Sequence, residues 1–155
     1  MKILLLAIGR KHNADLVTAI EAYGRRLTHY TTVGWHLIEP VKGKLDQPMT
    51  RRLESDALER ELQSDDYVIL LDERGKQLTS RQLADCIETH QQQATRRLVF
   101  IIGGAFGVDE RLRQRANLVW SLSALTFPHQ FVRLILTEQL YRAFAIMKGE
   151  PYHHE

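Results

Sequence analysis

Residues 98–129, LVFIIGGAFGVDERLRQRANLVWSLSALTFPH, decide the fold that we expect for this chain. The stretch opens on the apolar run 98–102, breaks on Gly103-Gly104, and holds a second strand-like piece at 117–122 before the neutral loop 123–129. A buried parallel strand that ends in glycines is typical of a ligand crevice, because glycine lets the backbone approach a bound molecule. The same glycines could also form a tight turn and nothing more.

Apolar runs alternate with amphipathic segments along the rest of the chain. The apolar runs predict strands at 2–8, 33–38, 67–71, 98–102 and 118–122, with 72–76 as the turn after the third strand. The amphipathic segments predict helices at 13–27, 50–63, 80–93, 109–116 and 131–147. We expect Asn13 and Ser80 to cap their helices, Leu53 to face inward, and Gly149 to end the last helix. The alternation predicts one α/β domain over residues 1–155, with a mostly parallel sheet of five to six strands flanked by helices.

Composition and charge restrict the class of protein without identifying it. The formal net charge is +2, but basic residues cluster, as at 10–11, 25–26, 51–52, 96–97 and 111–115. Clustered arginines suit phosphate contacts, although helix faces in solvent show the same pattern. Cys86 is the only cysteine, which fits the reducing cytosol. The apolar run 3–8 reads as a first strand, and it is too short to be a membrane span.

The final predicted helix is apolar on almost every side. Its apolar residues are Val132, Leu134, Ile135, Leu136, Leu140, Tyr141, Ala143, Phe144, Ile146 and Met147. A helix of this kind needs cover on more than one side. We therefore expect a homodimer built partly on this helix.

Three predicted strand ends, at 70–75, 102–107 and 122–129, should lie together, because the carboxyl ends of parallel strands share one edge of the sheet. The last two of these segments carry little charge and offer backbone hydrogen bonds and small apolar walls, which favours a nucleoside-type ligand over a bare phosphate. The glycines do not match the dinucleotide fingerprint, because Ile102 stands where its first glycine should be.

Several blocks together resemble one family. They are Ile101-Ile102-Gly103-Gly104 with Gly107, the run 121–129, Val132-Arg133, the run 138–143 and Pro151-Tyr152-His153. In combination, the sequence is similar to the RlmH (YbeA) family of SPOUT-class methyltransferases, which act on N3 of a pseudouridine in large-subunit ribosomal RNA. The resemblance implies an α/β fold with a C-terminal trefoil knot, a homodimer, and S-adenosyl-L-methionine bound in the knot. It also implies a target in the helix 69 loop of 23S rRNA, most simply within an assembled ribosome, because the chain lacks a separate RNA-binding domain.

The resemblance also assigns site residues. It places the cofactor against Leu71, Gly103, Leu122, Ser123, Ala124, Leu125, Thr126 and Phe127. It makes Glu138, Arg142 and His153 catalytic, with the proton acceptor open between Glu138 and a tail histidine. It gives His129, Tyr152 and His154 to the substrate, and His154 stands where the family commonly has Arg or Lys.

Each of these assignments has a plainer alternative. Glu138 and Arg142 could be an ordinary i,i+4 ion pair, His129 a structural loop residue, and 152–154 a frayed terminus. The adjacent histidines 153 and 154 lack the spaced partners of a metal site.

Two other functions stay open at this point. A non-catalytic RNA- or ribosome-binding factor could keep the fold without the chemistry. A nucleotide-dependent oxidoreductase is disfavoured, because the first glycine and the following acidic residue are missing.

Overall fold

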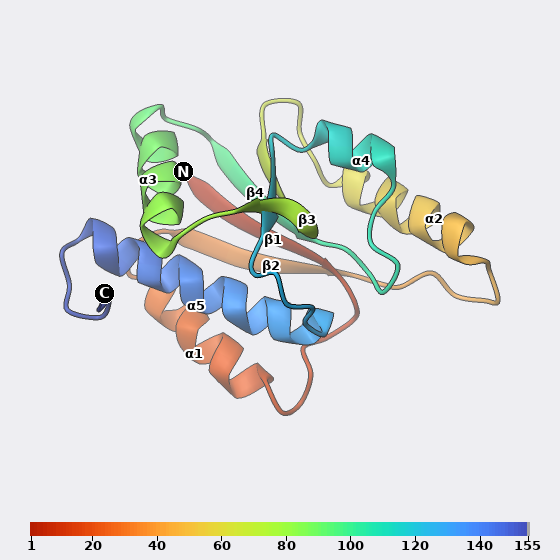
Figure 1. Ribbon diagram of the computed structural model, residues 1–155, viewed down its shortest axis with the longest axis horizontal. Helices are drawn as coiled ribbons and strands as arrows, with labels where there is room; N and C mark the ends of the chain where they lie inside the picture. The colour runs from red at the N-terminus through yellow and green to blue at the C-terminus, as the bar shows by residue number, and fades with distance from the viewer. Residues whose placement is uncertain (155) are drawn as a thin grey trace.

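The computed structural model describes residues 1–154, and its centre is a parallel sheet of five strands (Figure 1). The strands are β1 (Lys2–Ile8), β2 (Thr32–Ile38), β3 (Tyr67–Gln77), β4 (Arg97–Ile102) and β5 (Leu118–Ser121). Their order is β2-β1-β4-β3-β5, and every neighbouring pair is parallel. This confirms the predicted α/β class and the parallel sheet.

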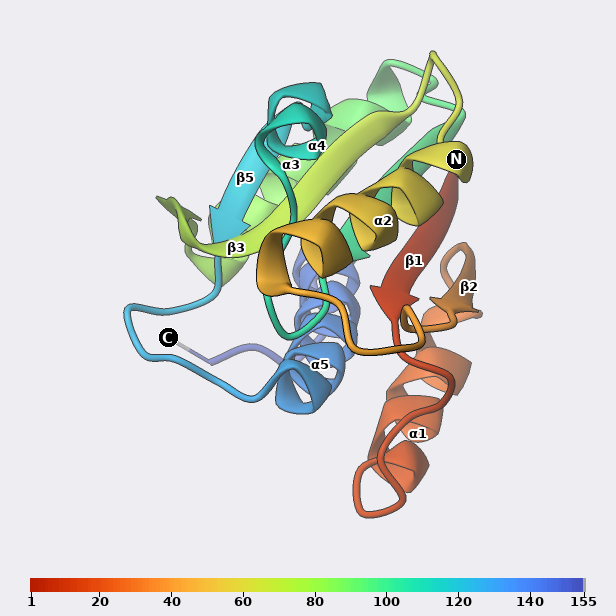
Figure 2. The same cartoon turned by 90° about the vertical axis from the view of Figure 1, so that its right-hand side faces the viewer.

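Helices cover both faces of the sheet. One face packs against α1 (Val17–Leu27), α3 (Ser80–Gln92) and α5 (His129–Met147), and the other against α2 (Gln47–Arg60) and α4 (Glu110–Arg115) (Figures 1 and 2). Successive strand residues alternate between the two cores: Phe100 lies in the first, and Val99 and Ile101 in the second. No helix within residues 1–154 is long and apolar enough to cross a membrane.

The caps of three helices differ from the prediction. Asp46 caps α2 by accepting the Met49 N–H at 2.8 Å, so this helix begins three residues before 50 and ends at Arg60. Thr79 caps α3 in a reciprocal box with Gln82, one residue before the predicted Ser80. Asn13 organises a turn by accepting the Asp15 N–H, and α1 starts only at Val17. Thr79 thus takes the capping role expected of Ser80, whereas α1 begins without a side-chain cap.

The inward-facing side of α2 also differs from the prediction. Glu54, Ser55 and Leu58 are its buried residues, whereas Leu53 is 38% exposed. Glu54 accepts the Val41 N–H at 3.4 Å, which gives this buried carboxylate a polar partner. The prediction that Leu53 faces the core is wrong.

Strand β3 continues through the segment predicted to be a turn. After an irregularity between Leu71 and Lys76, Lys76 and Gln77 pair with Trp120 and Ser121 of β5. A β-carbon on Gly75 would lie 2.5 Å from the Val119 carbonyl oxygen, so only glycine allows this close approach. The prediction of a turn at 72–76 is wrong. This part of the strand is polar because most of its side chains are exposed or only partly buried.

Helix α5 lies between α1 and α3 on the sheet, and it starts at His129, two residues before the predicted position (Figure 1). Leu136, Leu140 and Phe144 are fully buried within one chain. Most of the apolar surround is therefore covered by the chain itself. Near the start of the helix, Phe131 remains 47% exposed.

Candidate active site

The three predicted strand ends meet in one cleft at the carboxyl edge of the sheet. The cleft has a volume of about 760 Å³, within the range typical of small-molecule sites. Its walls come from 71–74 of β3, 102–108 after β4, and the β5–α5 loop with the start of α5. Figure 2 shows the ends of these strands converging beside the first turns of α2 and α5.

At the β4 end of the cleft, glycines stand where a larger side chain would collide with neighbouring atoms. A β-carbon on Gly103 would lie 3.0 Å from Val108 Cγ1 and 3.2 Å from the Gly107 carbonyl carbon. The Gly107 N–H donates to the Gly104 carbonyl at 3.0 Å, and Gly107 has a φ of +72°. The glycines therefore form a tight turn that also lines the cleft, so the two readings of this motif are compatible.

The β5–α5 loop is held in place by its own hydroxyl groups. Ser121 Oγ donates to the Ser123 carbonyl at 2.8 Å, and Ser123 Oγ accepts the Leu125 N–H at 3.0 Å. Thr126 Oγ1 donates to Glu73 Oε2 at 3.1 Å, which joins the loop to β3 across the cleft mouth. These bonds keep the cleft wall ordered in the absence of a long strand or helix in this loop.

The residues predicted to bind the cofactor fall mostly in this cleft. Leu71, Gly103, Leu122, Ser123, Leu125, Thr126 and Phe127 line it, and so does His129 from the predicted substrate set. Ala124 is exposed and lies outside the lining. Its place in a tight loop, with the side chain toward solvent, could not be read from the sequence.

Other lining residues were missed by the sequence analysis. Gln47 and Arg51 enter from α2; Gln47 lies before the predicted start of this helix, whereas Arg51 lay within the predicted helix but was not assigned to the cleft. Trp120 also lines the cleft, and its Nε1 is buried without a hydrogen-bond partner among residues 1–154. A buried donor without a partner is unusual, and it marks a wall that could offer one more hydrogen bond.

Asp72 carries a stable negative charge in the cleft. Burial alone would raise the pKa of Asp72, but hydrogen bonds from Arg74 and the charges of Arg113 and Arg74 outweigh it and hold the pKa below its ordinary value. Arg113 comes from α4, so a helix of the second face fixes this carboxylate.

A buried arginine fastens the β1–α1 loop to α5 next to the cleft. Arg133 has no solvent exposure, and its guanidinium donates to the carbonyls of Ile8 at 3.0 Å and Lys11 at 2.9 Å. His12 lies 3.2 Å from the same group; burial and then the charge of Arg133 lower the pKa of His12. Gly9, with a φ of +131°, leaves the space that the guanidinium fills.

The predicted catalytic residues form a separate cluster on α5 and the tail. Glu138 Oε1 accepts from Arg142 Nε at 3.0 Å and from the Tyr152 hydroxyl at 3.0 Å. Tyr152 also lies 3.1 Å from the Tyr23 hydroxyl, and His153 Nδ1 lies 3.3 Å from Arg142 Nη1. Residues 152 and 153 are therefore packed on α5, which contradicts the reading of a frayed terminus, while His154 is exposed.

The contacts within this cluster keep Arg142 charged and Tyr152 neutral. The hydrogen bond with Glu138 raises the pKa of Arg142, and burial together with Tyr23 and Glu138 raises the pKa of Tyr152. Glu138 and Arg142 are an ion pair, as the plainer alternative required, but Tyr152 and His153 share it. Within one chain this cluster does not line the cleft. Residues 1–154 contain no group of three or more His, Cys, Asp or Glu side chains that could hold a metal ion.

Comparisons with known proteins agree on one family. A family model described as "Predicted SPOUT methyltransferase" matches residues 1–153. The chain is 43% identical over 155 residues to the ribosomal RNA large subunit methyltransferase H of Gloeobacter violaceus, covering 99% of both proteins. It is 41% identical over 156 residues to the protein of that name from Christiangramia forsetii, again covering 99% of both.

A solved structure shows the same fold at much lower identity. A probable methylase family protein from Haemophilus influenzae Rd KW20 superimposes with a TM-score of 0.57 and 13% identity, covering 99% of this chain and 70% of the other. At that identity the likeness supports the fold alone.

Proposed function

The chain belongs to the SPOUT methyltransferase family, and from this premise we propose that it transfers a methyl group from S-adenosyl-L-methionine to N3 of a pseudouridine in 23S rRNA. The observation that carries the proposal is the cleft, in which three strand ends converge and two of them, at 102–107 and 122–129, carry little charge. The names of full-length relatives at about 40% identity support the ribosomal substrate. The proposal includes the helix 69 loop as target, the cytoplasm as location, and a C-terminal knot.

The cleft fits an adenosyl group by size and chemistry. Backbone groups of 122–127 and of Gly103 would bind the adenine edge and the ribose, while Leu71, Leu122 and Phe127 would cover the ring faces. When bound, S-adenosyl-L-methionine supplies an electrophilic methyl group, and the chain's task is to hold the nucleophilic nitrogen in line with it.

The chain must also manage the proton of N3. Glu138 or His153 would accept it, and Arg142 would stabilise negative charge on a base carbonyl. These groups lie outside the cleft of their own chain, so the proposal requires a homodimer in which the cluster of one subunit serves the cleft of the other. The exposed Leu125 and Phe131, at 68% and 47%, lie beside the cleft mouth and are suited to that interface.

A direct test is mass spectrometry of ribosomal RNA from cells with and without the gene. We expect one methylated pseudouridine to disappear on deletion and to return when the gene is restored. Purified protein should methylate large ribosomal subunits from the deletion strain better than protein-free rRNA. An unchanged set of modifications would contradict the proposal.

A mixing experiment tests the shared site. In a Gly103→Trp homodimer the clefts of both subunits are filled, and in a Glu138→Ala homodimer the clusters of both subunits lack their carboxylate. Each homodimer should therefore be inactive. If the cleft and the cluster belong to different subunits, half of the randomly mixed dimers regain one complete site, and activity returns to about a quarter of wild type. If both come from one chain, mixing restores nothing.

The alternative function is a non-catalytic ribosome-binding factor with the same fold. Isothermal titration with S-adenosyl-L-methionine separates the two, because the factor would bind the ribosome but not the cofactor.

A further inference from the structure

The start of α2 combines exposed apolar side chains with cations that lack an acidic partner. Within residues 1–154, the large apolar side chains that are most exposed are Leu45, Met49, Leu53, Phe106, Leu125 and Phe131. Three of these six, Leu45, Met49 and Leu53, follow each other at a spacing of four residues on the outer side of α2 and the turn before it. We call this set, together with Lys44 and Arg52, the α2 face.

The cations of the α2 face and its neighbour Arg51 are available to a partner. Lys44, Arg51 and Arg52 take part in no ion pair among the described residues. Asp56, one turn after Arg52, feels the charge of Arg52 but is already paired with Arg111. The charge of this surface is therefore largely uncompensated.

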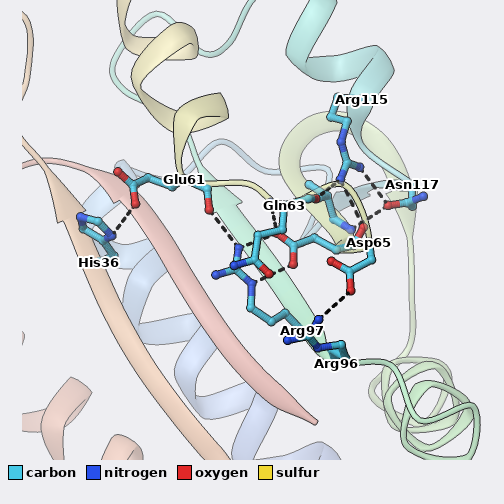
Figure 3. A network of polar contacts seen from close by, with 10 residues as sticks. His36, Glu61, Gln63, Asp65, Arg96, Arg97, Arg115 and Asn117 are labelled. Atoms are coloured by element: carbon cyan, nitrogen blue, oxygen red, sulfur yellow. Dashed lines mark hydrogen bonds and ion pairs between the residues drawn. The ribbon is translucent and has the colours of Figure 1, made fainter.

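The opposite edge of the sheet shows the contrast. There, Arg97 pairs with Asp66, Arg96 pairs with Asp65, and Arg115 donates to the Gln63 carbonyl (Figure 3). Arg97 and Arg115 are thus held by groups of the chain itself, and Arg96 forms a solvent-exposed ion pair. Of the arginine clusters in the sequence, the pair 51–52 is thus placed differently from 96–97 and 115.

The α2 face lies on the outer side of a helix whose inner side lines the active-site cleft, about half a turn around the helix axis from Gln47 and Arg51. Gln47 and Arg51 line the cleft, and Gly104 of its floor packs so closely on Glu54 of α2 that a β-carbon would come within 3.3 Å of Glu54 Cδ. In Figure 2 the first turn of α2 lies over the loop that follows β4. A polymer that brought one nucleotide to the mouth of the cleft would pass Arg51 and cross the first turn of α2 to reach the α2 face.

We propose that the α2 face is the docking surface for the RNA strand next to the target nucleotide, with Lys44, Arg51 and Arg52 contacting phosphates and Leu45, Met49 and Leu53 contacting bases. This inference rests on the proposed function for its choice of RNA. A second copy of the chain fits the surface less well, because a two-fold interface would bring these unpaired cations against their own copies. RNA supplies both the negative charge and the flat apolar bases that the surface lacks.

The test measures binding to large ribosomal subunits purified from cells without the gene, as a function of salt. Lys44→Gln with Arg52→Gln removes two charges from the α2 face, and Lys2→Gln with Arg96→Gln removes two exposed charges from the opposite edge as the matched control. We expect the first pair to weaken Kd about tenfold and to reduce the slope of log Kd against log salt by about 2, roughly one per phosphate contact. The control should change neither quantity by much.

The double variant Met49→Ser with Leu53→Ser tests how much the apolar side chains of the α2 face contribute to binding. It should weaken binding without changing the salt slope, because it removes no charge. The Kd for S-adenosyl-L-methionine and the number of subunits by light scattering should stay at wild-type values for all of these variants.

Equal Kd and slope for the two charge variants would overturn the inference, and so would a change in subunit number for the apolar variant, which would make the surface an interface between copies. Because binding is measured, failure of methylation alone would contradict the proposed function and leave this test intact.

Discussion

Arg133 shows how one residue can join the scaffold to the site. It is the largest side chain without solvent exposure, and its guanidinium meets two backbone carbonyls of the β1–α1 loop and no carboxylate among residues 1–154. Burial lowers the pKa of Arg133, yet arginine stays protonated because its ordinary pKa is so high. A buried cation is costly, so its hydrogen bonds must hold the loop firmly.

Replacing Arg133 by Met should therefore destabilise the fold. The change leaves the buried Ile8 carbonyl without its side-chain donor and the Lys11 carbonyl with only a 3.5 Å contact from Gln130, and we expect a loss of about 2–4 kcal/mol in the free energy of unfolding, measured by denaturant titration. Gln130→Ala is the control, since Gln130 accepts the Asn13 N–H at 2.9 Å in an exposed position and should cost less than about 1 kcal/mol. Equal losses for both variants would show that the buried arginine does not hold the loop.

At the level of an element, the second half of β3 depends on a single residue, Gly75. When β3 pairs with β5, the backbone of Gly75 lies against the backbone of Val119 and Trp120. A β-carbon on residue 75 would lie only 2.5 to 2.7 Å from backbone atoms of these two residues. The sequence Asp72-Glu73-Arg74-Gly75-Lys76 resembles a turn, and this contact is what makes it a strand.

Gly75→Ala should separate β3 from β5 and destabilise the protein by about 1–3 kcal/mol, the usual cost of overpacking. Gly24→Ala provides an opposite control. Gly24 lies inside α1, and nothing lies within 4 Å of where its β-carbon would stand, so alanine there should stabilise the helix by about 0.5–1 kcal/mol. Thermal unfolding of both variants measures the two signs, and a tolerated Gly75→Ala would refute the steric argument.

Elements with a continuous apolar signal could be predicted from the sequence, and elements without one could not. The strands at 2–8 and 98–102 are apolar because helices cover both faces of the sheet. The early start of α2 depended on Asp46 capping a polar segment, and the extra length of β3 depended on a contact with a distant strand. Long-range backbone contacts leave no local pattern.

The candidate site divides in the same way. Chain order and parallel pairing were enough to bring the ends at 70–75, 102–107 and 122–129 together. Arg51 was missed, because its place in the cleft depends on how α2 packs against the sheet, which has no local sequence pattern. Glu138 lies outside the cleft because α5 leads away from it after its first turn. The spacing of residues along a helix does not show the direction in which the helix runs.

On the scale of the whole molecule, the two edges of the sheet use charge differently. At the amino edge, Asp66 accepts from Arg97 Nε at 2.7 Å and from the Gln63 N–H at 2.7 Å (Figure 3). This network joins the loop after α2 to the start of β4. The amino edge is thus closed by the buried ion pair of Asp66 and Arg97, while at the carboxyl edge Arg113 pairs with Asp72 and Arg51 has no ion-pair partner among residues 1–154.

The closed edge should make stability depend on pH. Burial alone would raise the pKa of Asp66, but hydrogen bonds from Arg97 and Gln63 outweigh it and hold the pKa below its ordinary value. A carboxyl with a lowered folded pKa stabilises the fold above its unfolded pKa of about 3.9, and that stabilisation is lost as pH falls through the folded pKa. Asp66→Asn should therefore cost about 2–3 kcal/mol at pH 7, and the difference from wild type should shrink below pH 4.

Asp65→Asn is the matched control, because Asp65 is half exposed and meets Arg96 at 3.5 Å. An exposed pair of this kind contributes at most about 1 kcal/mol, and the loss should fall further in salt. Denaturant titrations of both variants between pH 3 and 7 separate the two cases. A difference between Asp66→Asn and wild type that stays constant over this range would mean that packing, and not the charge of Asp66, closes the amino edge.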